Sequence, residues 1–253
     1  MNFTTGTDAY GRGVGRYSAA LAEALCDAAG VADGDAALDI GCGPGGLVAE
    51  LARRLGADRA AGVDPSAPFV ATARLRVPGA DIREAGAEDL PFGDSSFDVV
   101  LSLLVVNFVS DPRRAVAEMR RVGRRTVAAC VWDYAGEMTM LRVFWDAALE
   151  LDPEAPDEGV VMRYCSPAEL AELWSAAALR DVVTGELVVQ ADYTDFDDYW
   201  SPFPAGIAPS GAYCASLDAR ERDALREACF RRLGSPTGPF RLSARAWFVR
   251  GEV

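Results

Sequence analysis

Short apolar runs alternate along the chain with stretches in which apolar residues recur at helical spacing. The runs expected to form buried strands cover residues 36–40, 60–63, 81–83, 97–104 and 126–131. Helical spacing covers residues 17–29 and 46–55, and further helices are expected after Pro65 and from Asp111-Pro112 onward. Strands that alternate with helices predict a parallel sheet with right-handed crossovers.

Two longer stretches, residues 133–165 and 193–240, interrupt this alternation late in the chain. Between them Ser166-Pro167 marks the start of a helix, and the last two strands are expected at 182–190 and 241–250. Because a long excursion joins these two strands, we expect an antiparallel edge. The pattern predicts an α/β fold: a Rossmann-like seven-stranded, mostly parallel sheet with helices on both faces and a small lid from the two insertions.

Composition and charge narrow the classes of partner. The 253 residues include 38 acidic and 25 basic side chains, which gives a formal net charge of −13. Duplex nucleic acid and anionic membrane surfaces both require cationic patches, so we expect neither as a partner. A chain of this length is expected to form a single domain, residues 1–253, and a homodimer stays open.

The six cysteines are scattered without a C-x-x-C pair, which indicates reduced thiols rather than disulfides or a metal site. No export signal or membrane-spanning run is found in the sequence, and we therefore expect a cytoplasmic protein. Every basic residue is arginine, which favours a bacterial source.

The candidate chemistry begins at the end of the first apolar run, in the segment Asp39-Ile40-Gly41-Cys42-Gly43-Pro44-Gly45-Gly46. Glycines can take positive φ and let a ligand approach the backbone, and a following helix offers free N–H groups. The discriminating residue is Asp39. Beside a pyrophosphate its carboxylate repels, whereas beside an ammonium or sulfonium it attracts by roughly 4 kcal/mol at 4 Å and an effective dielectric near 20. S-adenosylmethionine (SAM) carries both cations.

The same glycines also satisfy the dinucleotide fingerprint, with Asp64 near the offset at which an acidic residue binds a ribose. An NAD-dependent oxidoreductase is therefore an alternative interpretation. Asp39 favours SAM instead, and so do the acidic loop at residues 87–92 and the expected antiparallel edge.

In four ordered motifs the sequence resembles the class I SAM-dependent methyltransferase family, in particular its small-molecule branch related to quinone-biosynthesis methyltransferases. The motifs are Leu38-Asp39-Ile40-Gly41-Cys42-Gly43-Pro44-Gly45, Gly62-Val63-Asp64-Pro65-Ser66, Ala87-Glu88-Asp89-Leu90-Pro91-Phe92, and Ser96-Phe97-Asp98-Val99-Val100 with Asn107-Phe108-Val109-Ser110-Asp111-Pro112. The resemblance covers about residues 30–135, which are expected to form the cofactor-binding core. It implies transfer of a methyl group from SAM to an O, N or C atom of a small organic molecule.

The resemblance also implies roles for single residues. Asp39 and the backbone of Gly41 would hold the methionine portion of SAM, and Asp64 the two ribose hydroxyls. Glu88 or the Ala87 amide would hold the adenine, and Ser102 or Leu103 the amino group. The predicted cofactor-binding set is completed by four neighbours and three N-terminal residues: Cys42, Gly43, Pro65, Ser66, Tyr10, Arg16 and Tyr17.

Structural alternatives stay open for these acidic residues. Asp39 could be a strand-end residue that bonds nearby amides, Asp64 a helix cap before Pro65, and Glu88 a loop charge in water. Asp98 is expected at the start of its strand, away from the reacting atoms.

The catalytic residues are less defined, because the chain contains no histidine. Candidate bases lie in the two insertions, at Asp133, Tyr134 and Tyr199, with Glu137, Asp195 and Asp197 as further acids. Aromatic residues of the insertions could line an apolar acceptor pocket or form a core. The acidic segment 150–158 is expected to be a solvated loop. A SAM-binding protein without methyltransferase activity is a further alternative.

Overall fold

The computed structural model describes residues 13–206 and 208–253 and contains a seven-stranded sheet with the strand order β3-β2-β1-β4-β5-β7-β6. Its strands are β1 (Ala37–Ile40), β2 (Ala60–Asp64), β3 (Asp81–Glu84), β4 (Phe97–Leu103), β5 (Gly123–Trp132), β6 (Arg180–Tyr193) and β7 (Phe240–Glu252). The pairs among β1 to β5 are parallel, whereas β5 and β7 are antiparallel. The predicted fold class is confirmed.

The helices follow the strands in the order that the sequence predicts. They are η1 (Val14–Tyr17), α2 (Ser18–Ala29), α3 (Gly46–Leu55), η2 (Ala57–Arg59), α4 (Ala67–Arg76), α5 (Pro112–Val122), α6 (Thr139–Leu151), α7 (Glu158–Val161), α8 (Pro167–Ala176), α9 (Phe196–Trp200), α10 (Ala208–Ser216) and α11 (Ala219–Arg232). Asp111 and Ser166 cap α5 and α8 through their side chains, each before a proline in the first turn. Gly123 both ends α5 and begins β5, so this strand starts three residues before the predicted Thr126.

Contacts divide the chain into two compact units, which are described separately. The sheet unit comprises Ser18–Trp132, Arg163–Leu187 and Ala246–Val253. The insertion unit comprises Asp133–Met162, Val188–Arg245 and the described residues up to Tyr17. The insertion unit thus contains most of both predicted insertions, and the division into one domain stays a prediction.

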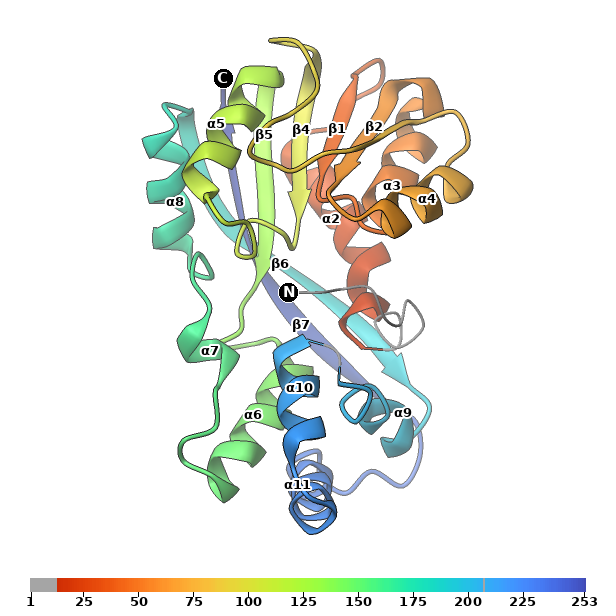
Figure 1. Ribbon diagram of the computed structural model, residues 1–253, viewed down its shortest axis with the longest axis vertical. Coiled ribbons are helices and arrows are strands. Elements are labelled where there is room, and N and C mark those ends of the chain that lie inside the picture. The colour runs from red at the N-terminus through yellow and green to blue at the C-terminus, as the bar shows by residue number, and fades with distance from the viewer. Residues whose placement is uncertain (1–12, 207) are drawn as a thin grey trace. The chain divides into compact units, whose positions relative to one another are not determined.

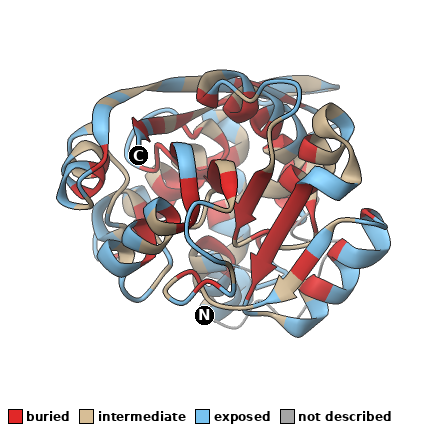
Figure 2. Ribbon diagram, turned by 90° about the horizontal axis from the view of Figure 1, so that it is seen from above, coloured by how far each residue is buried: buried red, intermediate tan, exposed pale blue. Residues whose placement is uncertain are grey.

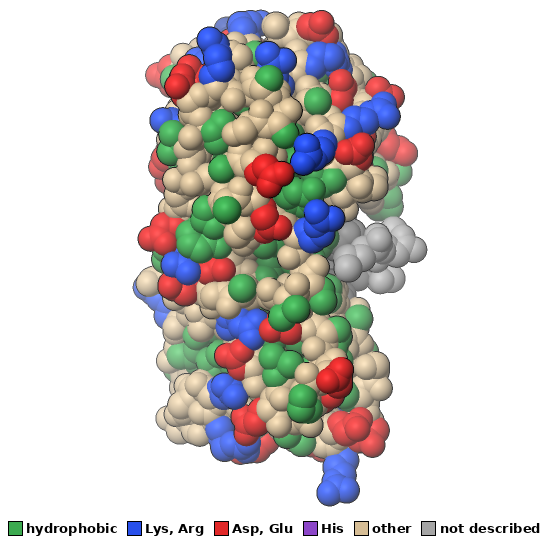
Figure 3. Space-filling view, turned by 90° about the vertical axis from the view of Figure 1, so that its left-hand side faces the viewer, with side chains coloured by type: hydrophobic (Ala, Val, Ile, Leu, Met, Phe, Trp, Pro, Cys, Tyr) green, Lys and Arg blue, Asp and Glu red, His purple; other side chains and the backbone are tan. Residues whose placement is uncertain are grey.

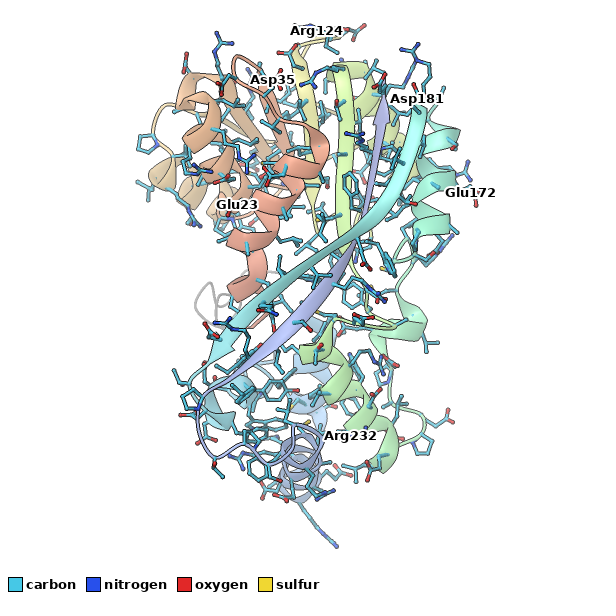
Figure 4. All side chains as sticks on the ribbon, turned by 180° about the vertical axis from the view of Figure 1, so that it is seen from behind. Glu23, Asp35, Arg124, Glu172, Asp181 and Arg232 are labelled. Carbon is cyan, nitrogen blue, oxygen red and sulfur yellow. The ribbon has the colours of Figure 1, made fainter. Side chains whose placement is uncertain are left out.

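Helices cover both faces of the sheet in the sheet unit. In Figure 1, α5 lies in front of the strands and α2 behind them, and Figure 4 shows the same elements from behind. α2 contacts β4, β5 and α3, while α5 contacts β4, β5 and α8. Every residue of β1 and β2 is buried, and strand arrows in the middle of Figure 2 are red. Burial on both sides is the reason that these strands read as continuous apolar runs.

The insertion unit has an aromatic core. Its helix α6 contacts both α10 and α11, and the rings of Phe144 and Phe203 stack with centroids 4.4 Å apart. Six aromatic residues of the insertions that could have lined a pocket are all buried: Tyr134, Phe144, Trp145, Tyr199, Trp200 and Phe203. Their ring contacts are those of a packed core.

The prediction of a solvated acidic loop at 150–158 is wrong at both ends, because residues 150 and 151 belong to α6 and the last two residues are buried. Asp157 is 6% exposed and Glu158 is 2% exposed. Asp157 pairs with Arg142, and Glu158 Oε2 accepts a hydrogen bond from Trp145 Nε1 at 2.8 Å. Each carboxyl group has a specific partner, which makes its burial tolerable where charge pattern alone suggests solvent.

All six cysteines are free thiols, and five of them are buried. Among residues 13–206 and 208–253, no helix is both long enough and apolar enough to cross a bilayer.

Candidate cofactor site

The sheet topology brings together the carboxyl ends of β1, β2 and β4, which carry the candidate cofactor-binding residues. β1 lies between β2 and β4, with Ile40 opposite Val63 on one side and Ser102 on the other. β2 ends at Asp64, one residue beyond this pair. From β1 the chain adds β2 and β3 on one side and then returns to add β4 on the other, so the strand order reverses at β1. In open parallel sheets, ligands bind at such a reversal, beyond the carboxyl ends of the strands.

The loop between β1 and α3 requires glycine at its turning points. Gly41, Gly43 and Gly45 have φ values of 71°, 50° and 85°. A Cβ atom on Gly41 would lie 2.6 Å from a methyl carbon of Val105, so no side chain fits there. At Gly43 a Cβ would meet no described atom within 4 Å, which leaves this stretch of backbone approachable.

The backbone N–H groups of this loop are already bonded within the protein. Gly41 and Cys42 both donate to the carbonyl of Val63, at 2.8 and 2.9 Å, and Gly45 donates to Cys42. Gly43 donates to Asp64 Oδ2 at 2.9 Å. A phosphate cradle works through free N–H groups, so this loop is poorly suited to an anion.

Asp39 is the most unusual group of the site. It is 1% exposed, and its Oδ1 atom is buried without a hydrogen-bond partner among the described residues. Burial, and secondarily the charge of Asp64, raises the pKa of Asp39 to about 8, although the Val48 N–H lowers it through a hydrogen bond. An orphaned carboxyl oxygen beside a second carboxylate fits a cationic ligand.

Asp64 holds two segments of backbone. Its Oδ2 accepts from Gly43, and its Oδ1 accepts from the Ser66 N–H at 2.8 Å, just before α4. Burial raises the pKa of Asp64, and these two bonds oppose the rise. Each carboxylate oxygen has a second lone pair, so these bonds leave capacity for ligand hydroxyls.

Glu88 is tied to the loop that follows β4. Its Oε1 accepts from the Ser110 hydroxyl at 2.8 Å and from the backbone N–H groups of Ser110 and Asp111. Burial alone would raise the pKa of Glu88, but these bonds bring it below its ordinary value. The carboxylate therefore has a structural task, and its contact with adenine stays a prediction, as does that of the buried Ala87.

The remaining cofactor-binding candidates of the sheet unit lie at or just beyond the carboxyl ends of these strands. Ser102 is buried and its hydroxyl donates to the Ile40 carbonyl at 3.3 Å, while Leu103 is the last residue of β4. The Cys42 side chain is 5% exposed, and Pro65 and Ser66 connect β2 to α4.

Asp98 lies at the opposite end of the sheet, as expected. It is the second residue of β4, accepts from the Ala36 N–H and pairs with Arg124. Figure 4 labels Arg124 and Asp35 at that end, where β5 and β1 begin.

The N-terminal candidates Arg16 and Tyr17 belong to the insertion unit. The Arg16 guanidinium donates to both carboxylate oxygens of Asp198 and lies 4.0 Å from the ring centroid of Tyr193. The hydroxyl groups of Tyr17 and Tyr193 are 3.0 Å apart. These contacts fasten the start of the described chain to the end of β6, and Tyr10 lies outside the described residues.

The three catalytic candidates are engaged in structural contacts of the insertion unit. Asp133 is 4% exposed and pairs with Arg245 at 2.8 Å, and it also accepts from the Glu137 N–H. The carbonyl of Tyr134 accepts from Arg142. The Tyr199 hydroxyl donates to the Met140 carbonyl, and burial raises the pKa of this phenol well above its ordinary value. The phenol therefore stays protonated near neutral pH and is not available as a base.

Glu158 is a titratable group that sequence reasoning missed. Burial raises its pKa to about 7, and the Trp145 indole N–H is its hydrogen-bond donor. A clue was present in the sequence, because Asp157 and Glu158 precede an apolar pair, Val160-Val161, as the first turn of a helix does.

Charges of both signs are interspersed on the face shown in Figure 3, without a broad blue patch among the described side chains. Within the described part of the chain, no three Cys, Asp or Glu side chains are grouped so that they could hold a metal ion.

Residues 38–130 match the model of a family described as a methyltransferase domain. The chain is 37% identical over 112 residues to 2-phytyl-1,4-naphtoquinone methyltransferase of Trichormus variabilis, covering 42% of this chain and 49% of that protein. It is 46% identical over 79 residues to ubiquinone biosynthesis O-methyltransferase of Cereibacter sphaeroides, covering 30% and 31%. The chain thus spans half or less of the length of these curated relatives.

Several solved structures cover nearly the whole chain, and one of them illustrates the likeness. The [4+2]-cyclase SpnF has a TM-score of 0.54 at 18% identity, with 92% of this chain and 80% of that chain covered. At this identity the likeness concerns the fold. Residues 38–130 carry a methyltransferase domain, and the strand order agrees with the fold likeness to this solved structure.

Proposed function

We propose that this chain transfers a methyl group from SAM to an O, N or C atom of a small organic molecule by in-line displacement. The observation that carries the proposal is the buried, unpartnered oxygen of Asp39 at the end of β1, within the matched methyltransferase domain. A carboxyl group buried in this way ionises only beside a cationic partner, and SAM supplies one.

In this proposal the sheet unit binds and orients the cofactor. Asp39 and the Gly41 backbone hold the methionine portion, and Asp64 accepts from the ribose hydroxyls. Ala87 and Glu88 border the adenine, and Ser102 or Leu103 the amino group. The cofactor supplies a methyl group on a positively charged sulfur. The protein's contribution is orientation and exclusion of water, which are worth several kcal/mol of barrier without a base.

The NAD-dependent alternative is disfavoured by the loop itself. Its N–H groups at Gly41, Cys42, Gly43 and Gly45 have acceptors within the protein, and two carboxyl groups lie beside it. A pyrophosphate there would gain few hydrogen bonds and meet negative charge.

A second candidate function is a SAM-binding protein that does not methylate. It is supported by the contacts of Asp133 and Tyr199, which tie the side chains of two of the three candidate bases to other parts of the insertion unit.

The test is formation of S-adenosylhomocysteine from SAM in the presence of a panel of small acceptors. Quinols and phenols come first, because the relatives' names concern quinones. We expect turnover with at least one acceptor class and its loss in Asp39→Ala. Saturable SAM binding without turnover on any acceptor would contradict methyl transfer and favour the second candidate.

We further propose that the protein acts in the cytoplasm of a bacterium and without a nucleic-acid partner. The six free thiols support a reducing compartment, and the net charge of −13 opposes binding to a polyanion. Whether the chain forms a homodimer is tested by measuring its mass in solution.

A further inference from the structure

The geometry around Asp39 is unfavourable for a negative charge. The side chain is 1% exposed, and one of its oxygen atoms has no hydrogen-bond partner within the described residues. The one bond that opposes this burial comes from the Val48 N–H at the start of α3. A buried ion without a partner costs several kcal/mol, so a carboxyl group in this position retains its proton instead.

Among the described residues, the groups that face Asp39 from the neighbouring elements do not supply positive charge. Asp64 approaches from the end of β2, Cys42 from the glycine loop, Cys26 from α2 and Cys130 from β5. Burial raises the pKa of Cys26 to about 12 and raises those of the other two thiols as well, so all three are neutral near pH 7. Asp64, which accepts two backbone N–H bonds, adds negative charge beside Asp39.

We propose that Asp39 is protonated in the cofactor-free protein and that SAM binding releases this proton to solvent. The inference rests on the proposed function, because it requires a cationic cofactor at the carboxyl end of β1. The O–H bond of the carboxyl group breaks, the proton passes to the buffer, and the carboxylate left behind pairs with the positive charge of the cofactor. Cofactor binding at this site is thereby coupled to pH.

The coupling fixes the direction of the pH dependence. Only the ionised form of Asp39 pairs with a cation, so the observed affinity for SAM rises with pH. It levels off at the pH at which Asp39 is already ionised in the cofactor-free protein. With the pKa of free Asp39 at about 8, the affinity increases by roughly tenfold per pH unit between pH 6 and 8.

The test is calorimetric titration of SAM into the protein at pH 7 in two buffers of different ionisation enthalpy. The difference between the two observed enthalpies gives the number of protons released, and we expect about one per SAM bound. The α-amino group of SAM has its own pKa in the ordinary range near 8. The decisive quantity is therefore the difference between the wild type and Asp39→Asn, which we expect to bind more weakly and without this release.

Glu158→Gln is the matched control. It removes another buried carboxyl group with a raised pKa, in the insertion unit, and should release as many protons as the wild type. If Asp39→Asn does not bind SAM, infrared difference spectra of the wild type at pH 7 replace it. A protonated-carboxyl band should disappear when SAM is added.

The outcomes separate the inference from the function on which it rests. Saturable SAM binding with equal proton release in the wild type and Asp39→Asn, or an unchanged carboxyl band, overturns the proton coupling and leaves the proposed function intact. Absence of SAM binding in every variant, the wild type included, overturns the proposed function itself.

Discussion

At the scale of single residues, the site depends on two carboxyl groups in different environments. Asp64 has two backbone N–H donors, whereas one oxygen of Asp39 has no partner among the described residues. The first arrangement stabilises a fixed negative charge that organises the loop. The second leaves a group whose charge depends on what binds beside it.

Asp64→Ala should weaken SAM binding by a few kcal/mol. Hydrogen bonds from two ribose hydroxyls to a charged group are worth about 1.5–3 kcal/mol each, and the loss of the Gly43 bond also loosens the loop. Calorimetric titration measures the change. The control is Asp58→Ala, which removes an exposed carboxylate in η2 and should leave affinity unchanged. Equal affinity in Asp64→Ala and the wild type would contradict the ribose assignment.

Local sequence patterns predicted these site residues but not their hydrogen-bond partners. The apolar run and the glycine spacing located Asp39 and Asp64 at strand ends, because both signals lie within a few residues. The hydrogen bonds that Ser110 donates to Glu88 and Arg16 donates to Asp198 join residues 22 and 182 positions apart. Spacing along the chain carries no information on such contacts, which explains why the hydrogen-bond partners of Glu88 and Arg16 were not predicted.

At the scale of elements, α7 shows how a short helix is held by two buried acids. Glu158 accepts from Trp145 on α6, and Asp157 caps α7 through the Gly159 N–H and pairs with Arg142. The exposed Val160 and Val161 contribute little apolar burial. We infer that the polar contacts, rather than burial of α7, fix this element.

Glu158→Gln should stabilise the protein above pH 7. The pKa of Glu158 is raised by burial to about 7, so between pH 4.5 and 7 the folded protein retains a proton that the unfolded chain loses. Stability due to this group therefore falls as pH rises through that range. Glutamine keeps an acceptor for Trp145 and carries no charge, and we expect a gain of about 1–3 kcal/mol at pH 8 that vanishes near pH 4.

Chemical denaturation at pH 4, 6 and 8 measures this difference in free energy of unfolding. Glu154→Gln is the control, because Glu154 is exposed on the same segment and should show little change at any of these pH values. A pH-independent effect of Glu158→Gln would contradict a titrating buried acid.

At the scale of the whole molecule, two strands belong to both compact units. β6 runs from Arg180 to Tyr193 and β7 from Phe240 to Glu252, and the division between the units falls within each of them. Neither unit can unfold without breaking strands that the other uses. We therefore expect cooperative unfolding of the two units.

Differential scanning calorimetry should show one transition that shifts upward as a whole with SAM. At a ligand concentration 100 times its Kd, the stabilisation is about 2.7 kcal/mol. Two transitions, of which one ignores SAM, would contradict cooperation between the units.

The mostly parallel sheet, its antiparallel edge and the late insertions were predictable because they follow from the alternation of elements, whereas the internal packing of the insertions was not. From the sequence alone, aromatic residues at 144, 145, 199 and 203 are compatible with a pocket or a core. Their ring contacts, which include a stack between the distant residues 144 and 203, show that they form a core.

The central claim is that a carboxyl group at the end of β1 selects a cationic cofactor over a phosphorylated one. Parallel calorimetric titrations of the wild-type protein with SAM and with NAD test it most directly. We predict saturable binding of SAM, lost or strongly weakened in Asp39→Ala, and no saturable binding of NAD. Saturable binding of NAD to a protein that leaves SAM unbound would contradict it.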